Sequence, residues 1–149
     1  MVGIKTIYEN SNIKGNAHVS CIKYRNLNNL SHYHSDYELV YVNKGCATVA
    51  INEKIFNLNS NECVFIYSND IHFIKSDANT VITVLKAENK YFGNLFSSKR
   101  LLSPVVNKIE NVESALNNIR SELNSHIYHS DVMAYTLSTQ LFITLLRNG

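Results

Sequence analysis

Short apolar segments separated by polar turns fill the chain from about residue 17 to residue 87. In order, they are AHVSCIKY, YELVYV, CATVAIN, KIFNL, ECVFIY, IHFI and TVITVLKA. Some alternate apolar and polar residues, and others are apolar throughout. Segments of this length and spacing predict an all-β sandwich or barrel. A hairpin is predicted about Asn52 and Glu53, between the third and fourth segments.

The period of the apolar positions changes after about residue 103. Ser103 and Pro104 are typical of a helix start, because a hydroxyl caps the first turn and proline suits its first position. The apolar residues that follow are spaced alternately by four and three, which is a helical seam. They are Val105, Ile109, Val112, Leu116, Ile119 and Leu123. We predict a first helix here, after a connection at residues 88–100 that has one helical turn of its own.

A second helix is predicted from Ser130–Asp131 to Leu146, with a wider apolar side that includes Leu141 and Leu145. One neighbouring helix does not cover so wide a face, so part of it meets the barrel, the first helix or a second subunit. The narrow seam of the first helix suits either the outside of the barrel or a partner helix. We expect a homodimer through this helical tail, formed by the seam residues with Leu141 and Leu145.

Composition excludes several classes of protein. The chain of 149 residues fits one domain, and 45% hydrophobic with 17% charged residues is ordinary for a globular protein. Its formal charge is +2, and its basic residues are scattered, with Lys99–Arg100 as the longest run. A nucleic-acid surface needs clustered cations, so we do not expect this chain alone to bind DNA.

Cys21, Cys46 and Cys63 are odd in number and lack C-x-x-C spacing, which predicts reduced thiols in a cytoplasmic protein. The N-terminal residues contain no apolar signal region, and no apolar run approaches the ~20 residues of a membrane helix. We therefore expect no membrane partner.

The stretch SHYHSDYELVYVNKG, residues 31–45, carries the candidate site. Residues two apart in a strand share a face, so His32, His34 and Glu38 are predicted to point the same way. The residues that alternate with them, and face the other way, are Tyr33, Tyr37, Leu39 and Tyr41. Both faces need cover, as in a closed barrel. His72, in NDIHFI, is expected to approach from a neighbouring strand.

Three interpretations of His32, His34, Glu38 and His72 remain open. Three imidazoles and a carboxylate suit zinc, iron, nickel or manganese. The same groups also suit a small-molecule pocket, or they satisfy one another in a polar core. In each case a buried Glu38 needs a cation, a histidinium or a hydrogen-bond donor. Aromatic residues of the barrel are typical of a core, and we include Tyr24 in the ligand pocket. No nucleophile motif predicts a catalytic residue.

These residues resemble a known family. The run H32-Y-H34-S-D-Y-E38-L-V-Y-V-N-K-G45 is similar to the first cupin motif, and N61-E-C-V-F-I-Y-S-N-D-I-H72 is similar to the second. The sequence of these motifs, together with the AINEKIFNL hairpin, resembles even more closely the N-terminal sensory domain of AraC/XylS-type transcription regulators. The sequence departs from the family at turns: Asn61–Glu62 replaces Gly-Asp, Ser68 replaces proline, and Asn26 replaces a glycine.

The resemblance implies a mainly β fold: a cupin barrel (a double-stranded, jelly-roll-like β-helix) followed by two C-terminal helices. It implies an N-terminal arm at residues 1–16, a sensory barrel with its connection at 17–100 and a helical dimerisation region at 101–149. A small effector would bind in the barrel and control a DNA-binding helix-turn-helix half that this chain lacks. The alternative is a small metal-dependent cupin enzyme, a dioxygenase or isomerase. In that case the quartet of His32, His34, Glu38 and His72 would hold a divalent transition metal.

Overall fold

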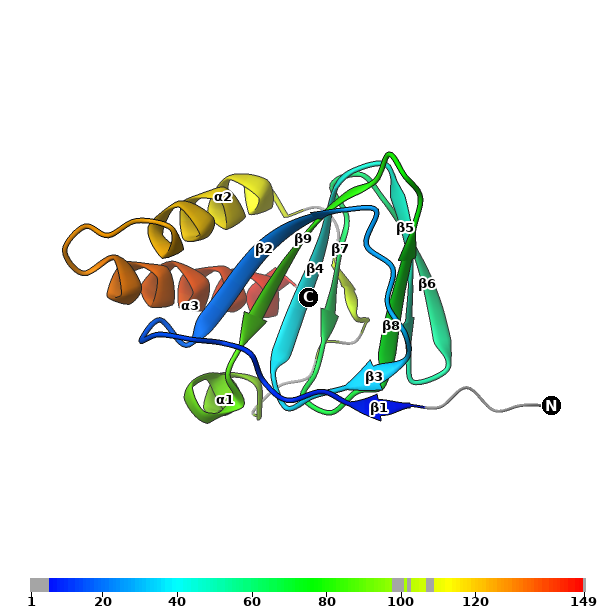
Figure 1. The fold of residues 1–149 in the computed structure, drawn as a ribbon, viewed down its shortest axis with the longest axis horizontal. Helices are drawn as coiled ribbons and strands as arrows, with labels where there is room; N and C mark the ends of the chain where they lie inside the picture. Colours follow the sequence, from blue (N-terminus) through cyan, green and yellow to red (C-terminus); the bar gives the residue numbers. More distant parts are fainter. Residues whose placement is uncertain (1–5, 98–100, 102, 107–108, 149) are drawn as a thin grey trace.

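In a computed structural model, the described residues are 6–97, 101, 103–106 and 109–148. Two β-sheets face each other, and helices cover the outer face of one of them (Figure 1). The predicted arm, connection and first helix each include positions outside the described residues, namely 1–5, 98–100 and 107–108. The two sheets and the helices form three layers.

Among the described residues, each sheet has five strands. The first sheet contains, in spatial order, β1 (Ile7–Tyr8), β3 (His32–Tyr33), β8 (His72–Ser76), β5 (Cys46–Ile51) and β6 (Lys54–Asn59). The second contains β10 (Val105–Val106), β7 (Cys63–Ile66), β4 (Tyr37–Lys44), β9 (Val81–Ala87) and β2 (Val19–Arg25). The strands thus form two separate sheets rather than the closed barrel that we expected.

The predicted hairpin is present. Strands β5 and β6 pair from Cys46 opposite Asn59 to Ile51 opposite Lys54. The two residues between them, Asn52 and Glu53, have φ angles of 46° and 74°. Positive φ at both central residues is the geometry that matches the right-handed twist of the flanking strands.

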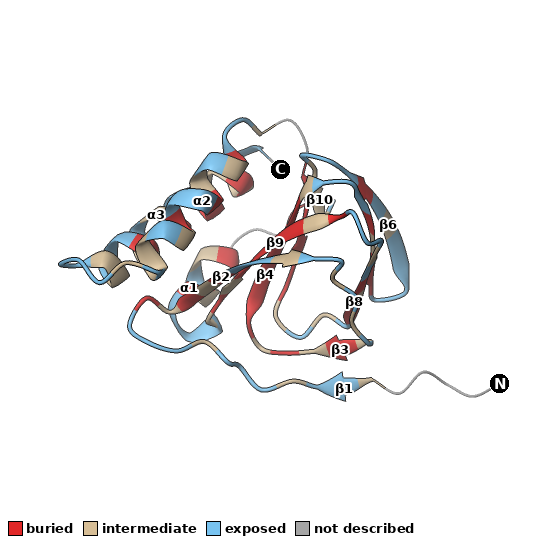
Figure 2. Ribbon diagram, turned by 45° about the horizontal axis from the view of Figure 1, so that its top comes forward, coloured by how far each residue is buried: buried red, intermediate tan, exposed pale blue. Residues whose placement is uncertain are grey.

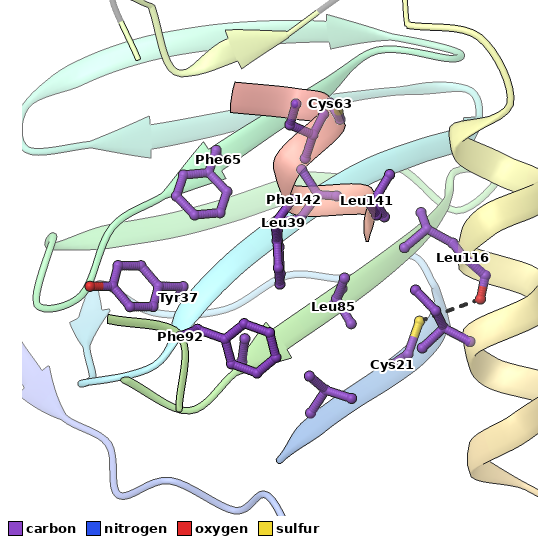
Figure 3. Close-up of a cluster of buried hydrophobic side chains, with 14 of the residues drawn as sticks. Cys21, Tyr37, Leu39, Cys63, Phe65, Leu85, Phe92, Leu116, Leu141 and Phe142 are labelled. Atoms are coloured by element: carbon purple, nitrogen blue, oxygen red, sulfur yellow. Dashed lines mark hydrogen bonds between the residues drawn. The ribbon is translucent and has the colours of Figure 1, made fainter. Parts of the chain in front are cut away.

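Strand β4 separates two apolar cores. Tyr37, Leu39 and Tyr41 belong to an outer core between the second sheet and the helices. Val40 and Val42 belong to an inner core between the two sheets. The alternation predicted from the sequence is therefore confirmed, but helices, rather than barrel closure, cover the outer face. Figure 3 shows Leu39 of β4 beside side chains of the helical layer.

The part of the chain that the structure describes contains three helices, α1 (Asn89–Ser97), α2 (Val112–Leu123) and α3 (Ser130–Asn148). The second predicted helix therefore starts where we expected. The connection holds a nine-residue helix rather than a single turn, because Phe92 and Phe96 bury themselves in the outer core. On the other side, α2 lies along β2, where the Cys21 thiol donates to the Leu116 carbonyl at 3.7 Å (Figure 3).

The predicted helix start at Ser103–Pro104 is wrong. Val105 and Val106 instead form β10, paired with Val64 and Cys63 of β7. Before them, the Pro104 carbonyl accepts a hydrogen bond from the Phe65 amide at 2.8 Å. Two adjacent β-branched residues beside an open sheet edge favour pairing over a first helical turn. Helix α2 begins only after Asn111, whose φ is 66°.

The residues that we expected at a dimer interface lie largely inside the chain. Val112, Leu116, Ile119, Leu141 and Leu145 are buried in the outer core. Ile109 and Leu123 are half-buried against the same core, and Val105 packs against the inner one. These side chains therefore stabilise the monomer, because other residues of the chain already cover them. Dimerisation through the C-terminal helices stays a prediction.

Within the described part of the chain, none of the helices has the length and apolar character that crossing a bilayer requires.

Candidate functional site

The structure brings the four predicted residues together. One ligand atom from each of His32, His34, Glu38 and His72 lies within 4.8 Å of the others, and all four residues are buried. The imidazole rings of His32 and His72 are 4.2 Å apart between centroids. Burying four polar side chains between apolar sheets is costly unless they are paired with one another or with a ligand. The interactions among these four side chains therefore need to be accounted for.

The route to this convergence differs from the prediction. The three residues of the first motif do not lie on one strand, because β3 ends at Tyr33 and β4 begins at Tyr37. His34 lies in the short crossing between the first and the second sheet. His32 pairs directly with His72 in the first sheet, and Glu38 faces them from the second. The acid and these two histidines thus meet across the space between the sheets.

Each of the three histidines of this cluster presents Nδ1 to a backbone carbonyl. The distances are 2.8 Å from His32 to Leu30, 3.1 Å from His34 to Asp36 and 2.8 Å from His72 to Asp70. A carbonyl oxygen only accepts hydrogen bonds, so Nδ1 of each ring carries a proton. The three Nε2 atoms then define the chemistry of the site.

Two of those Nε2 atoms lie against the same carboxylate oxygen. Oε2 of Glu38 is 2.8 Å from Nε2 of His34 and 3.1 Å from Nε2 of His72. An ionised carboxylate also only accepts, so a neutral ring protonated on Nδ1 gives it no donor. The contacts are favourable when the rings are imidazolium ions or when a cation lies among these atoms. The geometry therefore calls for positive charge beside Glu38.

The pKa shifts agree with this charge distribution. Burial raises the pKa of Glu38, but hydrogen bonds from His34 and His72 outweigh it and hold the pKa well below its ordinary value. Burial lowers the pKa of His72, yet its hydrogen bond to Glu38 and the acid's charge raise it above the ordinary value. The pKa of His32 is lowered, mainly by burial. His72 is thus the more readily protonated of these two rings.

The donor set also fits a divalent transition metal. Three imidazole nitrogens and one carboxylate oxygen are ligands of zinc, iron, nickel and manganese sites. Histidines that bind metals commonly donate their other ring N–H to a carbonyl, as all three do here. The quartet would hold such an ion directly, and the carbonyls of Leu30, Asp36 and Asp70 would fix the ring orientations.

Sequence reasoning missed two charged residues beside the quartet. Lys86 lies opposite Glu38 in the β4–β9 pairing, so both side chains project between the sheets. A lysine in the apolar segment TVITVLKA, at the parity of the inward-facing residues, was the available signal. Asp36 is buried, and its Oδ2 has no hydrogen-bond partner among the described residues. Burial raises the pKa of this carboxyl.

Tyr24, the fifth predicted ligand residue, is half-buried against the inner core from β2. Its phenol is one of the groups that act on the charge of Lys86. The side chain of Tyr24 is therefore on the inner face of the second sheet, as is that of Lys86. Its role as a ligand stays a prediction.

The described part of the N-terminal arm lies over this cluster. Strand β1 runs parallel to β3, with Ile7 opposite His32, and remains exposed beside it (Figure 2). The Glu9 amide donates to the Tyr33 carbonyl at 2.9 Å. The carboxylate of Glu9 contacts Lys86, with Oε1 3.2 Å from Nζ. Ser11 acts against burial by lowering the pKa of the Asp36 carboxyl. The arm is therefore docked by both backbone and side-chain contacts.

A separate cleft of about 390 Å³ lies beside β6 and β7. Its walls include Phe56, Phe65 and Tyr67, together with Lys54 and the segment around Pro104. It is an apolar location of the size that small ligands use. The titratable residues of its walls are Lys54, Tyr67 and Asp70, none of which belongs to the quartet.

Comparison with known proteins identifies the family. The model of the AraC-like ligand binding domain matches residues 17–140. This chain belongs to that family. The match and the two-sheet topology confirm the predicted fold class, a mainly β cupin fold with C-terminal helices, although the helices number three among the described residues.

Solved structures extend the likeness to most of this AraC-like domain. Apo ToxT from Vibrio cholerae is 16% identical, with a TM-score of 0.60, and the match covers 91% of this chain and 58% of that one. The chain thus spans little more than half of ToxT. An RmlC-like cupin from Shewanella frigidimarina is 17% identical over 52% of this chain and 74% of that one, with a TM-score of 0.43. No curated protein sequence matches the chain.

Proposed function

We propose that this AraC-like domain senses a small effector at the quartet and regulates transcription through a DNA-binding part of the same protein. The carrying observation is the buried cluster of three histidines and Glu38 beneath the docked arm. Membership of a ligand-binding family supports sensing rather than catalysis. A site of convergent polar groups at the edge of an apolar core is suited to a small ligand.

Strand β4 supplies a physical connection from the site to the helices. Glu38 belongs to the quartet on the inner side of the strand. On the outer side, the ring of its neighbour Tyr37 lies 4.6 Å from the ring of Phe96 of α1, measured between centroids, in the outer core. An effector that binds one arrangement of β4 and the arm more tightly than another shifts the population toward it. Helices α2 and α3 lie on that outer core and would carry the difference to the rest of the regulator.

The test uses the full-length regulator and its promoter in a reporter strain. Glu38→Gln and His72→Gln should abolish the response to the effector when they are compared with the wild type at equal amounts of folded protein. Glu62→Gln, at a half-buried acid outside the quartet, is the matched control and should respond as the wild type does. A full response in both quartet variants contradicts the proposal.

A second candidate is that the bound species is itself a divalent transition metal. The shared Nδ1-to-carbonyl pattern supports it, because a ring protonated on Nδ1 keeps the lone pair of Nε2 available to an ion. Metal analysis of protein purified without chelators tests this: about one ion per chain, lost in His34→Gln, is the expected result. Metal-free wild type that still responds to its effector contradicts it. Turnover by the metal-loaded protein would instead favour the enzyme alternative.

A further inference from the structure

We propose that the effector carries a carboxylate, and that Glu9 of the arm occupies the place of that carboxylate when no effector is bound. This inference rests on the proposed sensing function and names the class of ligand, a small organic anion. The arm and the effector would then compete for the ammonium group of Lys86, beside His32.

The contacts of Glu9 define the subsite. Its Oε1 lies 3.2 Å from Nζ of Lys86, and its Oε2 lies 3.9 Å from Nε2 of His32. The side chains of Lys86 and His32 are only 14% and 9% exposed, whereas that of Glu9 is 44% exposed. Lys86 belongs to the second sheet and His32 to the first, so one carboxylate joins the two sheets. A free carboxylate of the same shape fits these two groups.

The charge of Lys86 requires such a partner. Glu38, directly opposite it in the sheet, already accepts hydrogen bonds from His34 and His72 through Oε2. Burial of the Lys86 ammonium is offset by the charge of Glu38 and by the ion pair with Glu9, which is its direct contact. When the arm leaves, that direct contact is lost, and Lys86 shares the Glu38 carboxylate with His34 and His72 until another anion takes the place of Glu9.

The arm is held weakly enough to be displaced. Strand β1 has only two residues, and the side chains of Ile7 and Tyr8 are 48% and 49% exposed. Its side-chain contacts include the Thr6–Ser31 hydroxyl contact at 3.4 Å, the Tyr8–Tyr33 ring contact and the Glu9 ion pair. Segments with few buried apolar contacts open at low free-energy cost. Displacement of the Glu9 carboxylate therefore removes a large share of what docks the arm.

Glu9→Gln in the 149-residue chain tests the inference, since it keeps the size of the side chain and removes the competing charge. Acetate and benzoate are titrated against acetamide and benzamide in carboxylate-free buffer, and the histidine ring signals are followed by NMR. If Glu9 fills the subsite about nine-tenths of the time, the variant should bind the carboxylates about tenfold more tightly than the wild type. The amides should bind neither protein.

Two further variants complete the test. Glu9→Gln combined with Lys86→Met should lose the gain, because the cation is gone. Glu53→Gln, at an exposed acid in the β5–β6 hairpin, should match the wild type. Equal carboxylate affinity in Glu9→Gln and wild type, no carboxylate binding in either, or equal binding of amides and acids each overturns the inference.

The outcome is distinguishable from failure of the sensing function. If neutral compounds shift the histidine signals and carboxylates do not, the anion inference fails while sensing at the quartet stands. If the quartet variants keep the full promoter response, the sensing function fails, whatever the Glu9 variant binds.

Discussion

Glu38 and His72 lie 34 positions apart in the chain and meet between the two sheets, with Oε2 of the acid 3.1 Å from Nε2 of the imidazole. This contact raises the pKa of His72 against the effect of burial. Glu38→Gln should therefore lower the pKa of His72, which an NMR titration of its ring proton measures. An unchanged His72 titration would show that the acid does not act on it.

The same pair predicts how stability depends on pH. The pKa of Glu38 is lowered on folding, so its contribution is present above its ordinary value of 4.5 and is lost as pH falls through the folded value. The pKa of His72 is raised, so its contribution is complete below 6.5 and is lost as pH rises through the folded value.

The difference in unfolding free energy between wild type and Glu38→Gln should therefore be largest between pH 4.5 and 6.5, and smaller on both sides. We expect about 1–3 kcal/mol at the maximum, the usual cost of a lost buried hydrogen bond to a charged group. Urea denaturation across this pH range measures it. A difference that grows steadily with pH would contradict the pairing.

The three thiols should differ in reactivity. Burial raises the pKa of both Cys21 and Cys63 to about 12, whereas Cys46 is exposed. The thiolate is the reactive form, so a disulfide reagent at pH 8 should modify only Cys46 in the folded protein. All three should react after unfolding. Loss of the fast reaction in Cys46→Ser identifies the site, and rapid modification of Cys21 in that variant would contradict its burial.

Leu116→Ala tests whether the helical seam serves the monomer. The side chain is completely buried in the outer core between α2 and β2, so its truncation should lower the unfolding free energy by about 2–5 kcal/mol. Val132→Ala, at a position of α3 that is 54% exposed, is the control and should change it by less than about 0.5 kcal/mol. Subunit dissociation in Leu116→Ala, with the unfolding free energy unchanged, would restore the seam as a dimer contact.

Gly45→Ala should be strongly destabilising. Gly45 has a φ of +89°, and a Cβ there would lie 2.6 Å from Oγ1 of Thr80. That hydroxyl donates to the Cys46 carbonyl at 2.9 Å, so it is not free to move away. Strain and overpacking together should cost roughly 2–4 kcal/mol by thermal unfolding.

Gly15→Ala separates the two effects. Gly15 has a similar φ of +82°, but nothing lies within 4 Å of its added Cβ. It should therefore lose only about 1 kcal/mol, from backbone strain alone. Equal losses in the two variants would mean that the contact with Thr80 is easily relieved.

Local patterns in the sequence were sufficient for much of the fold. The alternation in β4 correctly separates Glu38 from Tyr37 and Leu39, because inward and outward residues of a strand obey a fixed period. The hairpin about Asn52 and Glu53 was equally readable, since those residues tolerate positive φ. Both features depend on interactions over a few residues.

Features that depend on distant pairing were not readable. Val105–Val106 became a strand because the edge of β7 was available to it, and nothing near Pro104 in the sequence reveals that edge. The crossing at His34 between the sheets was hidden for the same reason. Nor does any local pattern show that Glu9, in a polar arm, reaches Lys86 across 77 positions.

Strand β4 contributes to the polar cluster with one face and to the outer core with the other, and this has a consequence for how the protein can evolve. Because consecutive residues of β4 face different chemical surroundings, a shift of its pairing by one residue would place Glu38 among aromatic rings and Tyr37 among the histidines. An insertion or deletion that shifted this register would therefore disrupt the cluster and the outer core together, and the crossing before β4 is constrained as well because it carries His34. Adaptation to new signals is then open to substitutions at inward-facing positions of both sheets, while the outward side of β4 stays matched to the helices.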